Sequence, residues 1–147
     1  NNFDVAKEEG NTFHEIMSEI YSKKDVELTL NKFSELGYIN KEQKIEYLET
    51  VNNIIGHPKL QMYFNDDVLS YNEREIISIS GNSVVPDKLV FLDKINVVII
   101  DYKTGLRKSS HQKQLKKYEV ILKEMNFKIS KKILVYIGKK IEVEMYE

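Results

Sequence analysis

Apolar residues recur at helical spacing through the first half of the chain. Side chains such as Phe13, Ile16 and Ile20 stand three or four positions apart, which places them on one face of a helix. The predicted elements are a helix over Asp4–Ser22, a helix from the N-cap Asp25 to Gly37 with Leu28, Leu30 and Phe33 inside it, a helix marked by Ile45, Leu48, Val51 and Ile55 that ends at Gly56, and a helical turn from Pro58 to Met62.

The spacing changes after Asp67, where alternating and isoleucine-rich segments predict strands. The segment Val97–Tyr102 is apolar on both faces, which is typical of a central strand. The predicted elements are strands over Tyr71–Ile79, Val84–Leu92 and Val97–Tyr102, a turn at Gly81–Asn82, a helix marked by Leu115, Tyr118, Ile121, Leu122 and Met125, and strands over Lys132–Ile137 and Ile141–Tyr146.

This order of elements predicts a mixed α/β fold. Three consecutive strands form a meander, a helix crosses over, and two further strands complete a mixed central sheet, with the N-terminal helices packed alongside. A length of 147 residues without repeats or linkers predicts a single domain over residues 1–147. The first residue is Asn rather than Met, so we expect a fragment of a longer protein.

The composition excludes several classes of protein. It is 41% hydrophobic and 31% charged, which is ordinary for a soluble globular domain. The chain contains no cysteine, so it holds no disulfide, iron–sulfur cluster or cysteine-bound zinc of its own. No apolar run reaches the roughly 18 residues that a membrane helix needs, and no secretory leader is visible. We therefore expect a cytoplasmic protein without a membrane partner.

The charge is unevenly distributed. A net charge of −1 is a point against nucleic-acid binding, because many isolated DNA-binding domains are clearly basic. The segment 103–117, however, contains lysines and arginines and no acid. Two interpretations remain open, a local face that binds phosphates and a solvated helix face.

Candidate chemistry gathers around three residues, Asp87, Asp101 and Lys103. Asp101 and Lys103 are two positions apart on a strand, so their side chains point to the same face. A turn between Asp93 and Asn96 pairs the two strands and can bring Asp87 near Asp101. Two carboxylates and a lysine suit phosphodiester hydrolysis, because hard oxygen ligands bind magnesium and a lysine stabilises phosphate charge. Taken alone, the alternative is a surface ion pair at a strand end.

Longer motifs around these residues strengthen the first interpretation. The stretch Asp101–Gly105 reads Asp-Tyr-Lys-Thr-Gly, Gln114 and Tyr118 form a Gln-x-x-x-Tyr pattern in the following helix, and His14 follows Gly10 in the first helix. Taken in their order along the chain, from Gly10 to Tyr118, these motifs resemble those of the RecB-type branch of the PD-(D/E)XK nucleases. The resemblance runs from about Gly10 to Ile137 and implies a restriction-endonuclease-like core.

The resemblance implies a role for each matching residue. His14, Asp87 and Asp101 would bind Mg²⁺ or Mn²⁺ together with the backbone carbonyl of Tyr102, and Lys103 would be the catalytic lysine. An acid on the preceding strand would support the site, and Glu75 is the better candidate, with Glu73 as the alternative on the same strand face. Gln114 and Tyr118 would contact the DNA backbone or brace the site. The alternatives without a role in the site are helix packing for His14, a solvated position for Gln114 and core packing for Tyr118.

The same family implies partners and context. Many members form the C-terminal exonuclease domain of UvrD-, RecB- or AddA-like helicase-nucleases, which repair and recombine DNA in the bacterial cytoplasm. DNA and a linked or partner helicase are therefore the expected partners. The chain itself should not bind ATP, because Gly105–Ser110 lacks the spacing of a phosphate-binding loop. Two alternatives are a catalytically inactive PD-(D/E)XK module and an unrelated α/β domain with a chance motif match.

Overall fold

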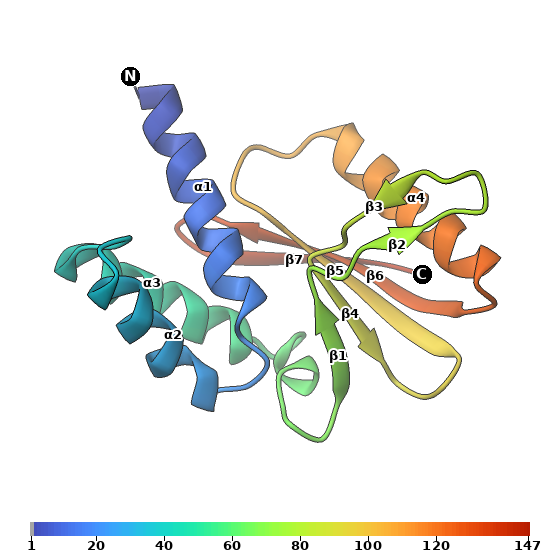
Figure 1. The fold of residues 1–147 in the computed structure, drawn as a ribbon, viewed down its shortest axis with the longest axis horizontal. Coiled ribbons are helices and arrows are strands. Elements are labelled where there is room, and N and C mark those ends of the chain that lie inside the picture. Colours follow the sequence, from blue (N-terminus) through green and yellow to red (C-terminus); the bar gives the residue numbers. More distant parts are fainter. Residues whose placement is uncertain (1) are drawn as a thin grey trace. The chain divides into compact units, whose positions relative to one another are not determined.

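The chain divides into two compact units, residues 1–66 and 67–147 (Figure 1). The computed structural model describes residues 2–147, and it describes side chains from Gly10 onward. The boundary at Asp66 coincides with the predicted change from helical to strand spacing. Whether the two units form the expected single domain stays a prediction.

The first unit is helical. It contains α1 (Asn2–Ser18), α2 (Lys24–Glu35), α3 (Lys41–Ile55) and the short 3₁₀ helix η1 (Gln61–Tyr63). α3 begins with a capping box, in which the Asn40 side chain accepts the backbone N–H of Gln43 and the Gln43 side chain accepts that of Asn40. The predicted ends at Gly37 and Gly56 are confirmed, and Gly37 has a φ of +80°, which few other residues adopt easily.

Two helix predictions were wrong in detail. α1 ends at Ser18 rather than at Ser22, and the last turn tightens as Glu19 and Ile20 donate to the carbonyls three residues before them. Asp25 is not the N-cap of α2 but lies in its first turn. Its carboxylate instead accepts the N–H groups of Tyr21 and Ser22 at 2.9 and 3.0 Å, which fixes the turn between the two helices. Leu28 lies within α2 as expected, and its side chain is 70% exposed.

The second unit is a mixed sheet with one long helix. Its described elements are β1 (Leu69–Asn72), β2 (Ile76–Ile77), β3 (Ser83–Val84), β4 (Lys88–Phe91), β5 (Asn96–Lys103), α4 (Ser109–Glu124), β6 (Lys128–Ile137) and β7 (Ile141–Tyr146). Five of these strands form a sheet in the order β1-β4-β5-β6-β7. The predicted meander β1-β4-β5, the central position of β5 and the crossover helix α4 into parallel β6 are confirmed.

The long hairpin at the start of this unit is interrupted. The predicted strands Tyr71–Ile79 and Val84–Leu92 each break in two, giving β1 and β2 on one side and β3 and β4 on the other. Pro86 has no N–H for the ladder, and Glu73 has a φ of 52°, which turns the chain out of the sheet. β2 and β3 therefore form a separate two-stranded ribbon, visible beside α4 in Figure 1. β6 also begins four positions earlier than predicted, at Lys128.

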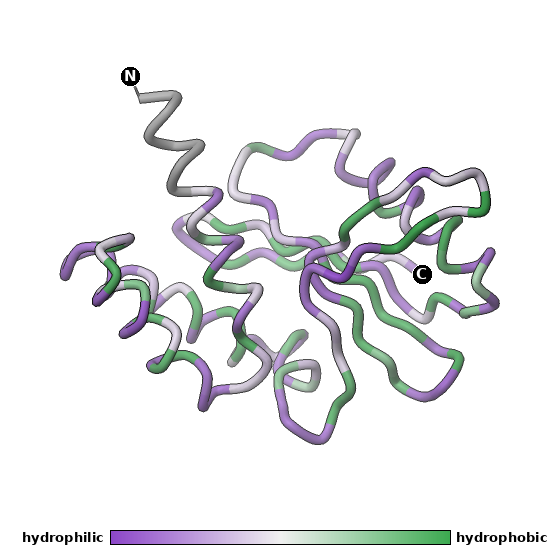
Figure 2. Tube along the Cα trace, in the orientation of Figure 1, coloured by the Kyte–Doolittle hydropathy of each residue, from purple (hydrophilic) through white to green (hydrophobic). Residues whose placement is uncertain are grey.

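α4 covers one face of the sheet. Its residues Leu115, Tyr118 and Leu122 are buried against Leu89 of β4 and Ile99 of β5. The continuous hydrophobic colouring of β4 and β5 in Figure 2 agrees with this burial. On β5 the residues that face α4 alternate with Val98, Ile100 and Tyr102 on the opposite face, so Asp101 and Lys103 extend the α4-facing row. Within the described helices, none is both long and apolar enough to cross a membrane.

Candidate functional site

Asp87 and Asp101 meet across the β4–β5 pair. The turn that begins at Asp93 sets a register in which Lys88 lies opposite Ile100, so Asp87 falls opposite Asp101. The contacts are reciprocal. The Tyr102 backbone N–H donates to Asp87 Oδ2 at 2.8 Å, and the Asp87 backbone N–H donates to Asp101 Oδ1 at 3.2 Å. The structure thus brings these two carboxylates, called here the carboxylate pair, to the end of the central strand.

Lys103 and Gln114 join the carboxylate pair. Lys103 Nζ lies 2.9 Å from Asp101 Oδ2, in an ion pair that is largely shielded from solvent. The same ammonium group donates to Oε1 of Gln114, which α4 presents toward the sheet. Gln114 is therefore not a solvated helix position without a role in the site. It holds the lysine side chain in place beside Asp101.

The electrostatics of the site are dominated by buried negative charge. Burial, and then the neighbouring charge of Asp87, raise the pKa of the Asp101 carboxyl to about 7, although Lys103 opposes the shift. Tyr118 packs in the core under α4, and its pKa is raised by burial and then by the charges of Asp101 and Asp87. The charges of the carboxylate pair therefore act on the Tyr118 hydroxyl, so Tyr118 is both a core residue and a neighbour of the site.

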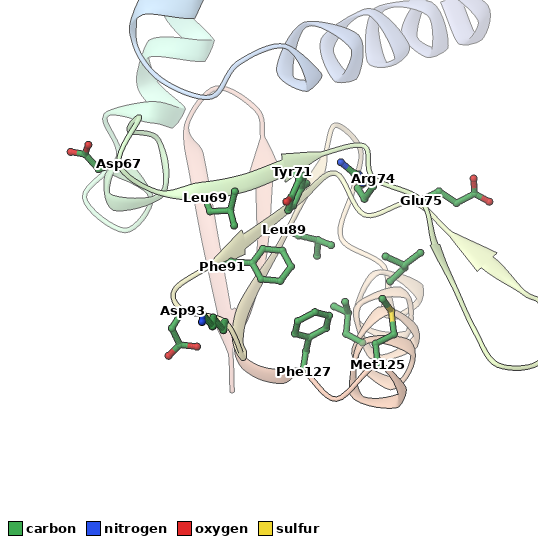
Figure 3. A pocket seen from close by; sticks show the side chains of 13 residues that line it. Asp67, Leu69, Tyr71, Arg74, Glu75, Leu89, Phe91, Asp93, Met125 and Phe127 are labelled. Atoms are coloured by element: carbon green, nitrogen blue, oxygen red, sulfur yellow. The ribbon is translucent and has the colours of Figure 1, made fainter.

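The expected supporting acid is placed differently from the sequence prediction. Glu73 donates its backbone N–H to the carbonyl of Asp87 at 3.1 Å, and its charge contributes to the raised pKa values of Tyr102 and Tyr118. Glu75 is exposed and points away from the sheet (Figure 3). The two acids do not share a strand face, because both lie in the break between β1, which ends at Asn72, and β2, which begins at Ile76. Both are exposed, and Glu73 is joined to Asp87 through its backbone N–H. Which of the two acids supports the site stays a prediction.

His14 lies in the other unit, on α1. Its Nδ1 is 2.8 Å from the carbonyl oxygen of Gly10, one helical turn earlier. A proton on Nδ1 in this bond places the ring lone pair on Nε2, which is the tautomer of a metal-binding histidine with a second hydrogen bond. The Gly10–His14 pattern noted in the sequence is thus a physical contact. The role of His14 as a ligand stays a prediction.

The carboxylate pair offers oxygen donors of the kind that divalent cations such as Mg²⁺ bind. Among the side chains from Gly10 onward, no three His, Asp or Glu groups lie close enough to hold a metal ion by themselves. Mg²⁺, however, commonly uses one or two carboxylates and fills its other positions with water and substrate phosphate. Burial first and the Asp87 charge second raise the pKa of Asp101, and a bound cation would offset the second of these effects.

A basic groove opens next to this network. It has a volume of about 530 Å³ and is lined by Val84, Val85, Ser110, His111, Lys113, Gln114, Lys117 and Tyr118. Its charged residues are all basic, and Gln114 and Tyr118 belong to both the groove and the site. His111, in the first turn of α4, has its pKa lowered by burial and then by the charges of Lys103 and Lys108. The acid-free segment 103–117 was the one sequence signal for this groove.

Comparisons with known proteins give no family. No family model matches the chain, and no curated protein matches it. Among solved structures, the chain is similar to one described as the crystal structure of SSO0001, with 23% sequence identity and a TM-score of 0.39. The match covers 79% of this chain and 60% of that chain, so this chain spans about three-fifths of the protein it matches.

Proposed function

We propose that the chain is a RecB-type PD-(D/E)XK nuclease domain with a restriction-endonuclease-like core, which hydrolyses DNA phosphodiester bonds with Mg²⁺ or Mn²⁺. The observation that carries this proposal is the continuous network from Asp87 through Asp101 and Lys103 to Gln114. Structural ion pairs at strand ends are usually exposed. This one is largely buried and has a second acid beside it, and burial and the Asp87 charge raise the pKa of Asp101 to about 7 against the opposing effect of Lys103. Such a perturbation is typical of functional sites.

Each residue has a physical task in this mechanism. Asp87, Asp101 and the Tyr102 carbonyl, with His14 as the resemblance implies, would hold the cation. When bound, the cation lowers the pKa of a water molecule and neutralises charge on the phosphate. Lys103 supplies a positive point charge beside Asp101 for the attacking water or a phosphate oxygen. Gln114 fixes the direction of that charge, and Glu73 adds negative charge near Asp87.

The basic groove gives the substrate strand a place to bind. Lys113 and Lys117 stand one helical turn apart on α4 and line the groove that reaches Gln114. Lysines contribute most of the non-specific affinity for nucleic acid through phosphate contacts. A backbone held there would approach the carboxylate pair by way of Gln114 and Tyr118. This arrangement supports DNA as the substrate despite a net charge of −1.

We further propose that the domain works with a linked or partner helicase in DNA repair or recombination. The support is the sequence resemblance alone, since members of that branch commonly process strands fed by a motor domain. In this arrangement the motor supplies most of the DNA affinity and the present chain supplies the cleavage chemistry.

The experiment is a cleavage assay on linear single- and double-stranded DNA with Mg²⁺, Mn²⁺ or EDTA. Wild-type chain is compared with Lys103→Ala and with Lys59→Ala, an exposed lysine of the helical unit. We expect metal-dependent cleavage that Lys103→Ala lowers at least about a hundredfold, because it removes charge stabilisation at the phosphate. Lys59→Ala should cleave like wild type.

The alternatives predict different results. Full cleavage by Lys103→Ala would point to an unrelated α/β domain with a chance motif. DNA binding without cleavage leaves an inactive PD-(D/E)XK module or a domain that needs its helicase. A Mn²⁺ titration of wild type and Asp87→Asn separates these two, because only a competent domain binds the metal in a manner that depends on Asp87.

A further inference from the structure

A second cavity opens on the α4-facing side of the sheet, away from the basic groove. This cavity, called here the aromatic hollow, has a volume of about 650 Å³, which is within the range of small-molecule sites. Figure 3 shows its wall, with Leu69, Tyr71, Leu89, Phe91, Met125 and Phe127 around the opening. All the residues that line it belong to the unit 67–147.

Aromatic rings form a continuous surface in the hollow. Tyr71 and Phe91 meet edge to face with ring centroids 5.6 Å apart, and Phe91 meets Phe127 in the same manner at 5.3 Å. The guanidinium of Arg74 lies 4.5 Å from the centroid of the Tyr71 ring. Phe91 and Phe127 are only partly buried. Partly exposed rings and a stacked guanidinium are the groups that proteins use to stack nucleobases.

The charged groups that remain toward the hollow are basic, because its lining includes Arg74 and Lys94. The carboxylates of Asp67, Glu75 and Asp93 belong to its lining residues but point away from it in Figure 3. The Asp93 carboxylate is also engaged by the backbone N–H groups of Ile95 and Asn96. The surface that remains is apolar and aromatic with two basic residues, Arg74 and Lys94, which suits a flat ring next to a phosphate better than a cation.

The position of the hollow connects it with the carboxylate pair. Leu89 and Phe91 follow Asp87 by two and four residues along β4, and Leu89 and Phe91 pack on the α4-facing side. At about 3.3 Å per residue, the hollow begins roughly 7 to 13 Å from Asp87. Successive bases of one stacked strand are about 3.4 Å apart, and an extended strand covers the same span with fewer nucleotides. A few nucleotides therefore bridge the two places.

We propose that the aromatic hollow binds one base of a single-stranded DNA substrate, a few nucleotides from the phosphate at the carboxylate pair. This inference rests on the proposed nuclease function. Tyr71 and Phe91 supply faces and edges for stacking, and Arg74 supplies a stacked plane with donors for the adjoining phosphate. The chain would then grip its strand at two points, by the backbone in the basic groove and by a base in the hollow.

The test measures binding of short oligothymidylates in EDTA, so that no strand is cut. One abasic position is moved step by step along the oligonucleotide. Leu69→Trp fills the hollow from its edge, since Leu69 lines it and is 57% exposed. Leu92→Trp is the matched control, because Leu92 is 52% exposed but does not line the hollow. Tyr71→Leu removes a ring while keeping an apolar side chain.

We expect an abasic site at one position to weaken binding by wild type and Leu92→Trp about tenfold, the effect of one lost stacked base. Leu69→Trp and Tyr71→Leu should bind the intact oligonucleotide about tenfold less tightly and show no further loss with the abasic one. Equal binding at every abasic position in wild type, or unchanged binding by both folded variants, would overturn the proposal. An abasic effect without metal-dependent cleavage would retain the base site, and the nuclease function would be overturned separately if the Mn²⁺ titration showed no binding that depends on Asp87.

Discussion

Asp101 is a carboxyl whose ionisation is costly in the folded chain. Burial and the charge of Asp87 raise its pKa from 3.8 to about 7. Because the folded state binds this proton more tightly than the unfolded state, the free energy of unfolding falls as the pH rises from about 4 to about 7. Below that window the group is protonated in both states and has no such effect.

Asp101→Asn should therefore raise the melting temperature at about pH 8 and change it much less at about pH 4. The amide keeps an oxygen for the Asp87 N–H and removes the charge. The measurement is thermal unfolding in EDTA at both pH values, with Asp93→Asn as a control, since Asp93 has a lowered pKa held by its bonds to Asn96 and Ile95. A destabilised Asp101→Asn at about pH 8 would show that the Lys103 pair outweighs the repulsion.

Glu73 can be tested without disturbing the backbone. Its φ of 52° is one that asparagine tolerates well, so Glu73→Asn removes the carboxylate and keeps the local conformation. We expect Glu73→Asn to lower metal-dependent cleavage about tenfold or more with little loss of stability, and Glu75→Gln to leave cleavage unchanged. Kinetics at saturating Mn²⁺ measure both, and the reverse order of effects would restore Glu75 as the supporting acid.

The residues of the site could be predicted to different extents. Asp87 opposite Asp101 followed from the length of the turn at Asp93, because a short turn fixes the register of two strands. The choice between Glu73 and Glu75 did not follow. That choice depends on the strand break at Glu73. It also depends on the loop from Ser78 to Asn82, which replaces the expected tight turn at Gly81. The alternation of apolar residues along a strand assumed to be unbroken predicts neither feature.

At the scale of elements, an ion-pair cluster joins α4 to β6. The buried Glu119 carboxylate accepts Nζ of Lys116 at 2.8 Å and Nζ of Lys132 on β6 at 3.1 Å. Burial raises the pKa of Glu119, but these hydrogen bonds and the lysine charges outweigh it and lower the pKa to about 2. The folded state thus favours the ionised form, and this stabilisation is present above about pH 4.5 and lost as the pH falls toward 2.

Glu119→Gln should lower the free energy of unfolding at neutral pH by about 2 kcal/mol, because it weakens charged hydrogen bonds to a partly buried lysine. Glu142→Gln, which alters the exposed pair with Arg107, should cost less than about 1 kcal/mol. Urea unfolding at about pH 7 gives both values. Equal losses of unfolding free energy in the two variants would mean that Glu119 stabilises the fold no more than an exposed ion pair does. The loss caused by Glu119→Gln should become smaller as the pH is lowered.

Element type followed from the sequence more readily than element ends. Spacing and glycine stops located all the long helices and the central strand, since these depend on local periodicity and burial. The end of α1 at Ser18 depends on Asp25 bonding backward to Tyr21 and Ser22. The broken hairpin depends on Pro86, which has no N–H for the ladder, and on the positive φ of Glu73 in the facing segment. A periodic pattern of apolar residues carries none of this local backbone information.

At the scale of the whole molecule, a net charge of −1 is the sum of basic and acidic side chains that lie in different parts of the chain. Lys113 and Lys117 of α4 line one groove next to the site network, whereas acids are frequent before Glu75. Binding of DNA should therefore be weak for the chain as a whole and strongly dependent on salt. The few phosphate contacts available in the groove set the steepness of that dependence.

Lys117→Gln tests this arrangement, because Lys117 lines the groove and is exposed, so its loss should not disturb the fold. We expect affinity for single-stranded DNA in EDTA to fall and the slope of log affinity against log salt to decrease by about 0.7, the value for one phosphate contact on a single strand. Lys116→Gln would also weaken Glu119, so Lys44→Gln in the helical unit is the better control. An unchanged slope for Lys117→Gln, or an equal change for Lys44→Gln, would remove the groove from the substrate path. The carboxylate pair would then need another route for its phosphate.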